Sequence, residues 1–101
     1  MRRGQTAKLT FGVNIPFESI RCVRILITQG NKTRIFEDAQ VTRLADRFEI
    51  NLSQEDTLAL SEGILQMQVR ATDDRGNAYA SNIMVTNVER TLDNEVITCK
   101  K

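Results

Sequence analysis

The chain has 101 residues, of which 41% are hydrophobic and 27% are charged, so it has the size and composition of one folded domain. Fourteen basic and thirteen acidic side chains give a formal net charge of +1, without the strong positive field of a dedicated nucleic-acid-binding protein. The sequence contains no histidine, which removes the commonest general base and the commonest zinc ligand. We therefore expect neither an enzyme nor a protein that holds a metal or another cofactor.

Apolar residues in the first third of the chain recur at every second position, which is typical of strands with one buried face. The first such stretch covers residues 9–13 and ends before Pro16. The second covers residues 23–28 and stops at the turn-forming pair 30–31, from which residues 33–36 return. The pattern predicts one strand followed by a hairpin.

The middle of the chain predicts two strands and then one short helix. Residues 41–44 form a weak strand pattern, and residues 48–52 form a clear one after a turn. Ser53 is followed three residues later by an acid, which resembles a capping box. We expect a helix of about two turns over residues 54–61, with Gly63 as its C-terminal cap.

A second hairpin follows, with strands over residues 65–71 and 79–86 and a turn rich in Asp, Gly and Asn between them. Gly76 is the turn residue that we expect at positive φ. Continuous alternation through both strands places Ile83 inside. The expected core consists of ten residues: Leu9, Phe11, Val23, Ile25, Ile27, Ile50, Leu65, Met67, Val69 and Ile83.

About seven short strands at spacings of roughly 8–12 residues predict an all-β fold, an antiparallel β-sandwich of immunoglobulin-like architecture with one short helix. A small barrel is the alternative. We expect residues 1–88 to form the sandwich domain with a short N-terminal arm, and residues 89–101 to form a C-terminal extension or arm.

Both ends of the chain have the character of arms that add a strand to a neighbouring sheet, although frayed termini fit the same pattern. Leu92, Val96 and Ile97 have no place in a closed core. We predict that these three residues bind a partner, that residues 89–97 pack on another chain, and that residues 100–101 are disordered.

Other candidate sites have weaker patterns. Asp73, Asp74 and Asn77 gather oxygen ligands, but the alternating acids of an EF-hand are missing, which favours a plain hairpin turn. The acidic pairs 37–38 and 46 with 49 are candidates for acid–base catalysis. They lie in loops and at outward strand positions, where charged side chains are ordinarily solvated. Strand arginines leave open an alternative function, a small nucleic-acid-associated regulatory protein; these are Arg21, Arg24, Arg34, Arg43, Arg47 and Arg70.

Several motifs together resemble a family of small structural proteins encoded in tailed-phage and prophage tail or baseplate gene clusters. These motifs are residues 1–6 with 9–11, residues 15–17 leading into 20–24, residues 52–58 before Gly63, and residues 68–71 through 76–81. The resemblance covers about residues 1–97. The same pattern is also similar to the N-terminal sandwich domain of upper baseplate proteins.

The resemblance implies a non-enzymatic building block that acts through protein–protein contacts. Its implied partners are other phage structural proteins and further copies of itself. We expect no small-molecule substrate and no membrane, and a nucleic-acid partner only for the alternative function. Its implied location is the virion, or the bacterial cytoplasm before assembly.

Overall fold

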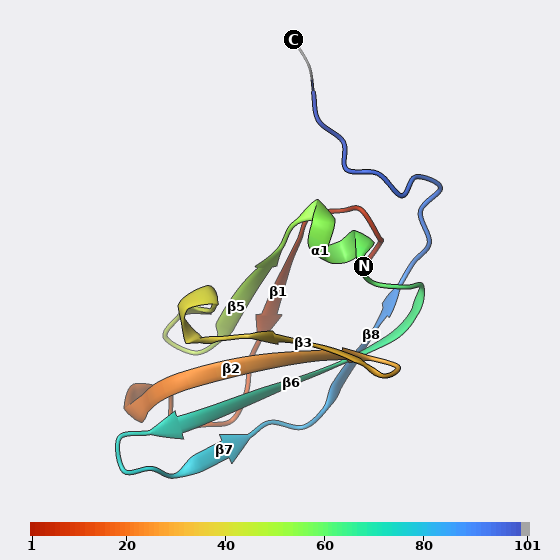
Figure 1. Ribbon diagram of the computed structural model, residues 1–101. Helices are drawn as coiled ribbons and strands as arrows, with labels where there is room; N and C mark the ends of the chain where they lie inside the picture. The colour runs from red at the N-terminus through yellow and green to blue at the C-terminus, as the bar shows by residue number, and fades with distance from the viewer. Residues whose placement is uncertain (100–101) are drawn as a thin grey trace.

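Two antiparallel sheets pack face to face in the computed structural model, which describes residues 1–99 apart from the side chain of Phe17 (Figure 1). The smaller sheet has the order β1 (Ala7–Phe11), β5 (Phe48–Leu52) and β4 (Thr42–Arg43). The larger sheet has the order β3 (Lys32–Phe36), β2 (Ile20–Gln29), β6 (Gly63–Asp73) and β7 (Ala78–Ala80), and β8 (Met84–Val88) also pairs with β6.

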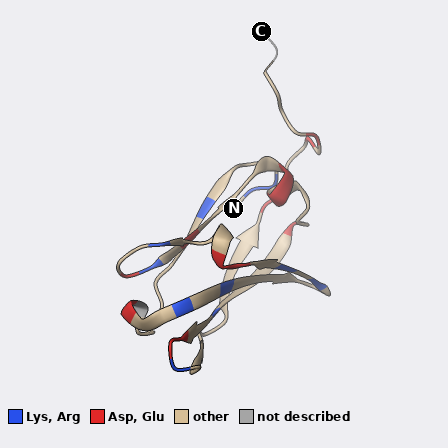
Figure 2. Ribbon diagram, turned by 60° about the vertical axis from the view of Figure 1, so that its left-hand side comes forward, with Lys and Arg blue, Asp and Glu red and all other residues tan. Residues whose placement is uncertain are grey.

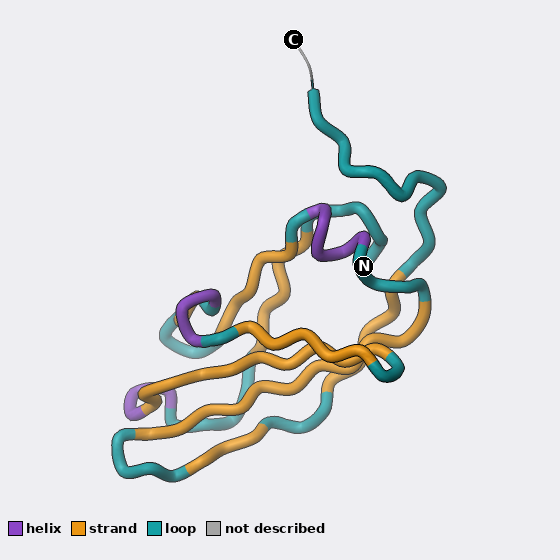
Figure 3. Tube along the Cα trace, in the orientation of Figure 1, coloured by secondary structure: helices purple, strands orange, loops and turns teal. Residues whose placement is uncertain are grey.

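Three short helical elements join the strands, as Figure 3 shows in purple. They are the 3-10 turns η1 (Phe17–Ser19) and η2 (Asp38–Gln40) and the helix α1 (Gln54–Leu58). The predicted all-β sandwich with one short helix is therefore confirmed. The predicted disorder of residues 100–101 lies outside the described residues.

The two sheets share one hydrophobic core. The structure buries eight of the ten predicted core residues, and the exceptions are Leu9, which is half-buried, and Ile83, which is 58% exposed. The prediction for Ile83 was wrong because the return strand contains an irregularity that the alternation does not reveal.

A β-bulge separates β7 from β8. Ser81 donates a backbone hydrogen bond to the Val69 carbonyl at 2.8 Å, whereas two residues further along β6 Met67 lies opposite Met84. Asn82 and Ile83 therefore share the space opposite the single residue between them on β6. The extra residue reverses the alternation, so Ile83 points outward while Met84 packs against the core.

The helix α1 begins as expected and ends earlier. The Ser53 hydroxyl accepts a hydrogen bond from the Asp56 amide at 3.1 Å, and the Asp56 carboxylate accepts one from the Ser53 amide at 2.8 Å, which confirms the capping box. The helix stops at Leu58, with Ala59 as its C-cap. Gly63 is not the cap, because it is the first residue of β6.

The N-terminal residues are paired within the chain. The Glu89 amide donates to the Met1 carbonyl at 2.6 Å, and the Arg3 amide donates to the Glu89 carbonyl at 3.0 Å. These contacts cover the free edge of β8 where this strand ends. The N-terminal segment is therefore not a free arm, and Glu89 is attached to the folded body, while the packing of residues 89–97 on another chain stays a prediction.

Candidate protein-interaction surface

The large apolar side chains that the described residues expose occur in two places, the C-terminal segment and the outer face of the five-stranded sheet. They are Leu92, Val96 and Ile97 in the first place, and Ile35, Ile64, Ile83 and Val85 in the second. Scattered exposed apolar residues are ordinary on a protein surface, whereas grouped ones mark sites of contact.

Residues 91–99, here called the C-terminal tail, contain no helix or strand. In Figure 1 the tail leaves the end of β8, passes above α1 and runs away from the sheets. The radius of gyration is 15.0 Å, compared with about 13 Å for a compact domain of this length. The tail therefore projects from the folded body.

The predicted partner-binding residues all lie on this tail and are all exposed. Leu92 is 92% exposed, Ile97 is 71% exposed and Val96 is 40% exposed. None of the three belongs to the hydrophobic core, as the sequence pattern predicted. Their role in binding stays a prediction.

Two side chains of the body hold the tail at specific points. The Arg3 guanidinium donates to the Asn94 side-chain oxygen at 2.9 Å. The Gln54 amide group donates to the Ile97 carbonyl at 3.2 Å and accepts from the Ile97 amide at 2.9 Å, so it pairs with the tail as a strand would. The tail is thus directed by the body, although it is not buried in it.

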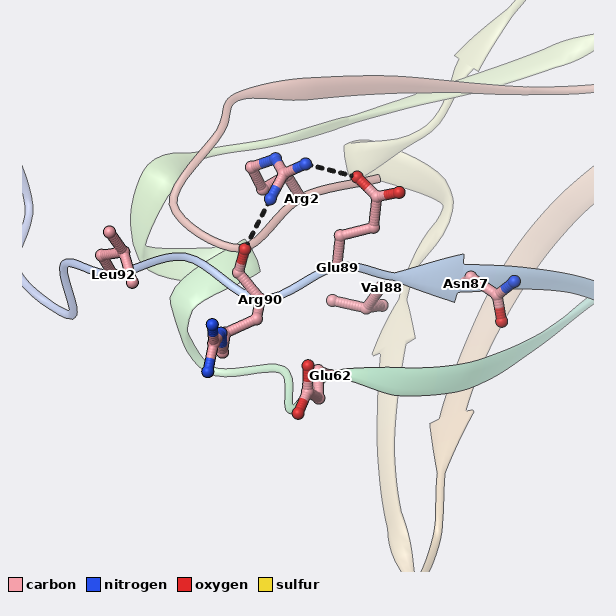
Figure 4. A pocket seen from close by; sticks show the side chains of 7 residues that line it. All are labelled: Arg2, Glu62, Asn87, Val88, Glu89, Arg90 and Leu92. Carbon is pink, nitrogen blue, oxygen red and sulfur yellow. Dashed lines mark hydrogen bonds and ion pairs between the residues drawn. The ribbon is translucent and has the colours of Figure 1, made fainter.

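The base of the tail is a small polar cluster around Arg2 (Figure 4). The Arg2 guanidinium forms an ion pair with Glu89 at 2.8 Å and donates to the Arg90 carbonyl at 2.6 Å. An open hollow of about 630 Å³ lies beside these groups, with Glu62 and Leu92 on its rim. No sequence pattern predicts this cluster, because it joins residues from the two ends of the chain.

Arg3 connects three parts of the molecule at this corner. Besides Asn94, its guanidinium donates to the carbonyls of Leu58 at 2.8 Å and Leu60 at 2.5 Å. The Leu58 carbonyl belongs to the last turn of α1 and the Leu60 carbonyl follows it, where a helix leaves acceptors without intrahelical partners. Arg3 therefore caps α1 and directs the tail with one side chain.

The second exposed group lies on the outer face of the larger sheet, here called the outer patch. It consists of Ile35 on β3, Ile64 on β6, Val85 on β8 and Ile83 in the bulge. Half-buried Leu26 lies between them, opposite Ile35 in the β2–β3 register. A shallow hollow of about 110 Å³ opens between Leu26 and Ile83.

The outer patch is uncharged. Its polar neighbours on the same face are threonine, glutamine and asparagine: Thr28, Thr33, Gln66, Gln68 and Asn87. Arg24 and Arg70 lie opposite each other in the β2–β6 register and border the patch toward the β6–β7 hairpin. A neutral apolar face is therefore accessible on the larger sheet, bordered by Arg70 and by the ion pair of Arg24 with Glu37.

The strand arginines do not gather into a basic face; Figure 2 shows both signs of charge distributed over the ribbon. Ion pairs join Arg24 to Glu37 at 3.1 Å, Arg34 to Asp56, and Arg43 to Asp38. Arg47 lies 3.8 Å from Asp46 and 4.0 Å from Glu49. These contacts engage four of the six arginines with neighbouring carboxylates.

The acidic pair 37–38 has a structural role. The Asp38 carboxylate accepts from the Val23 amide at 3.1 Å, while Arg43 donates to Asp38 and to the Ile20 carbonyl at 2.9 Å. The hydrogen bond from Arg43 lowers the pKa of Asp38. Together the two side chains continue the edge pairing of β2 beyond the end of β3 and join the two sheets.

Asp73 organises the β6–β7 hairpin. Its carboxylate accepts from the Asn77 side chain at 3.0 Å, from the amides of Asn77 and Arg75 at 2.9 Å each, and from the Tyr79 hydroxyl at 3.0 Å. The hydrogen bonds, led by that from the Asn77 side chain, lower the pKa of Asp73 to about 2. Gly76 has a φ of 83°, which confirms the predicted turn conformation.

No group of three or more metal-ligating side chains occurs among residues 1–99. Within the same residues, no helix is long and apolar enough to cross a membrane. Cys22 and Cys99 are exposed free cysteines. Comparison of the chain with protein-family models, curated proteins and solved structures gave no significant match.

Proposed function

We propose that this chain is a non-enzymatic structural component of a phage or prophage tail or baseplate and acts through protein–protein contacts made by its C-terminal tail. The observation that carries the proposal is the exposure of three apolar side chains, Leu92, Val96 and Ile97, on a projecting segment that the body holds in place. The sequence motifs described above supply the phage context.

The energetics favour a partner for the tail. Burial of a large aliphatic side chain is worth about 1.5–3 kcal/mol relative to its exposure, and this gain is not realised at Leu92 or Ile97 in the isolated chain. Ordering a flexible segment normally opposes binding. Because Arg3 and Gln54 already restrict the tail, part of that entropic cost is met before a partner binds.

The alternative function, a nucleic-acid-associated regulator, depends on arginines of the strands that gather on one sheet face and contact phosphates. Arg24, Arg34 and Arg43 instead form ion pairs with carboxylates of the same chain. A phosphate would have to compete with these carboxylates, and a net charge of +1 gives little long-range attraction. The structure therefore offers this function less support than it offers protein–protein assembly.

Co-elution with the products of flanking genes tests the proposal. Each product is expressed with the parent chain, with a Leu92→Ser/Ile97→Ser variant, and with a Leu92→Met/Ile97→Val control that keeps the apolar character. We expect at least one product to co-elute with the parent and the control, and to be lost with the serine variant. Flanking genes unrelated to phage tails, or co-elution unaffected by the serine changes, would contradict the proposal.

A further inference from the structure

The tail and the outer patch are two exposed apolar surfaces on one small chain. Together they contain every large apolar side chain that the described residues expose. Exposed apolar groups gain free energy when they cover each other. We infer that the tail of one copy binds the outer patch of a second copy, an inference that rests on the proposed role of the tail in assembly.

The tail is long enough for this contact. Residues 91–97 span about 23–25 Å when fully extended. The outer face from β3 across β2 and β6 to β8 includes three inter-strand spacings of about 4.8 Å, about 14 Å in all. A tail that crosses the strands can therefore contact apolar side chains on both borders of the sheet, such as Ile35 and Val85.

Two acids of the tail are complementary to one basic side chain beside the outer patch. Asp93 and Glu95 lie between the apolar tail residues, whereas the basic residues Arg90, Lys100 and Lys101 precede and follow this stretch in the sequence. The outer patch is neutral and is bordered by Arg70 and by Arg24, which is paired with Glu37. No acidic group of the described residues lies within ion-pair distance of Arg70, so this guanidinium is placed to receive a tail carboxylate from another copy.

The contact must form between copies. Arg3 and Gln54 hold Asn94 and Ile97 near α1, beyond the end of the sandwich. In Figure 1 the tail runs away from the larger sheet, so it does not cover the outer patch of its own chain. Binding of one surface to a different surface on the next copy is head-to-tail, which produces rings or filaments rather than a closed twofold dimer.

A complementation experiment tests this pairing with two variants that each keep one surface. Val85→Lys places a charge in the outer patch, where the side chain is 60% exposed and the fold tolerates it. A chain that ends at Arg90 lacks the tail but keeps the patch. We expect the parent to self-associate, each variant alone to be monomeric, and an equimolar mixture to form a complex of one copy of each, measured by sedimentation velocity.

Thr10→Lys is the matched control, because it adds the same charge to an exposed strand position on the smaller sheet. It should associate as the parent does, while Val85→Lys should stay monomeric at the concentrations at which the parent associates. Thermal melting of each variant verifies that it is folded.

Three results would overturn the pairing: undiminished association of Val85→Lys, a mixture that stays monomeric, or association that survives loss of the tail. If the parent is monomeric alone yet still co-elutes with a flanking-gene product through Leu92 and Ile97, the pairing between copies is wrong and the proposed function stands.

Discussion

Single polar side chains determine the local geometry of this small fold where the strands end. Asp73 accepts four hydrogen bonds within the β6–β7 hairpin, and Thr57, which is fully buried, donates from its hydroxyl to the Gln5 carbonyl at 2.8 Å. Each contact provides partners for polar groups that would otherwise be buried without them. Substitution of Asp73 or Thr57 should therefore destabilise the fold, although neither side chain belongs to the hydrophobic core.

Asp73 should make stability depend on acid pH. Its pKa of about 2 in the folded state lies below the ordinary value of 3.8, so its contribution is complete above about pH 4 and is lost as the pH falls toward 2. We expect Asp73→Asn to melt at a lower temperature than the parent at pH 7, with the difference shrinking between pH 4 and pH 2.

Asp74→Asn is the control, since Asp74 is exposed in the same turn and the substitution removes the same charge. Melting curves followed by circular dichroism at pH 7, 4, 3 and 2 measure the effect. A difference between Asp73→Asn and the parent that stays constant down to pH 2 would show that the carboxylate is not stabilised in the way its contacts indicate.

The strands were predictable because their alternation depends only on neighbouring residues. Phe11, Ile25 and Val69 are buried as the period of two required. The bulge after Ser81 was not predictable in the same way, because no residue type or spacing in the sequence marks it. One additional residue nevertheless reverses the face on which every following residue of the strand lies. Ile83 was consequently assigned to the wrong face.

The helix and the chain ends show the same limit of prediction from sequence: local contacts leave a pattern, and contacts between distant residues do not. Ser53 marked the start of α1 through a contact three residues away, which is a local pattern. The pairing of Met1 and Arg3 with Glu89 joins positions at opposite ends of the chain, for which no local pattern exists. The candidate tail could be located from sequence, whereas its attachment to α1 and to the N-terminus could not.

Arg3 should stabilise the contact of the N-terminal segment with the end of α1 and with the tail. Arg3→Met removes the hydrogen bonds to Leu58, Leu60 and Asn94 while keeping the aliphatic length of the side chain. We expect the free energy of unfolding to fall by about 1–3 kcal/mol, because charged donors to partly buried carbonyls are lost. Urea denaturation measures this change.

Arg75→Met provides the comparison, because Arg75 is an exposed arginine in the β6–β7 turn. Its substitution should change stability by less than about 0.5 kcal/mol. Equal effects of the two substitutions would mean that the Arg3 contacts do not stabilise the corner.

At the scale of the whole molecule, the structure separates a folded body from a projecting tail. The body has one continuous core and ends with Val88 buried and Glu89 paired to the N-terminus. The tail supplies no core residue, and its apolar side chains are exposed. This division is what a chain needs if one part is to fold alone and the other is to bind.

We expect the residues beyond Arg90 to serve self-association and not folding. Sedimentation equilibrium of the full chain and of the chain ending at Arg90, over the same concentration range and with melting temperatures measured in parallel, tests it most directly. The shortened chain should melt within a few degrees of the parent and stay monomeric, while the average mass of the full chain should rise with concentration. An unfolded shortened chain, or two chains with the same dependence of mass on concentration, would contradict it.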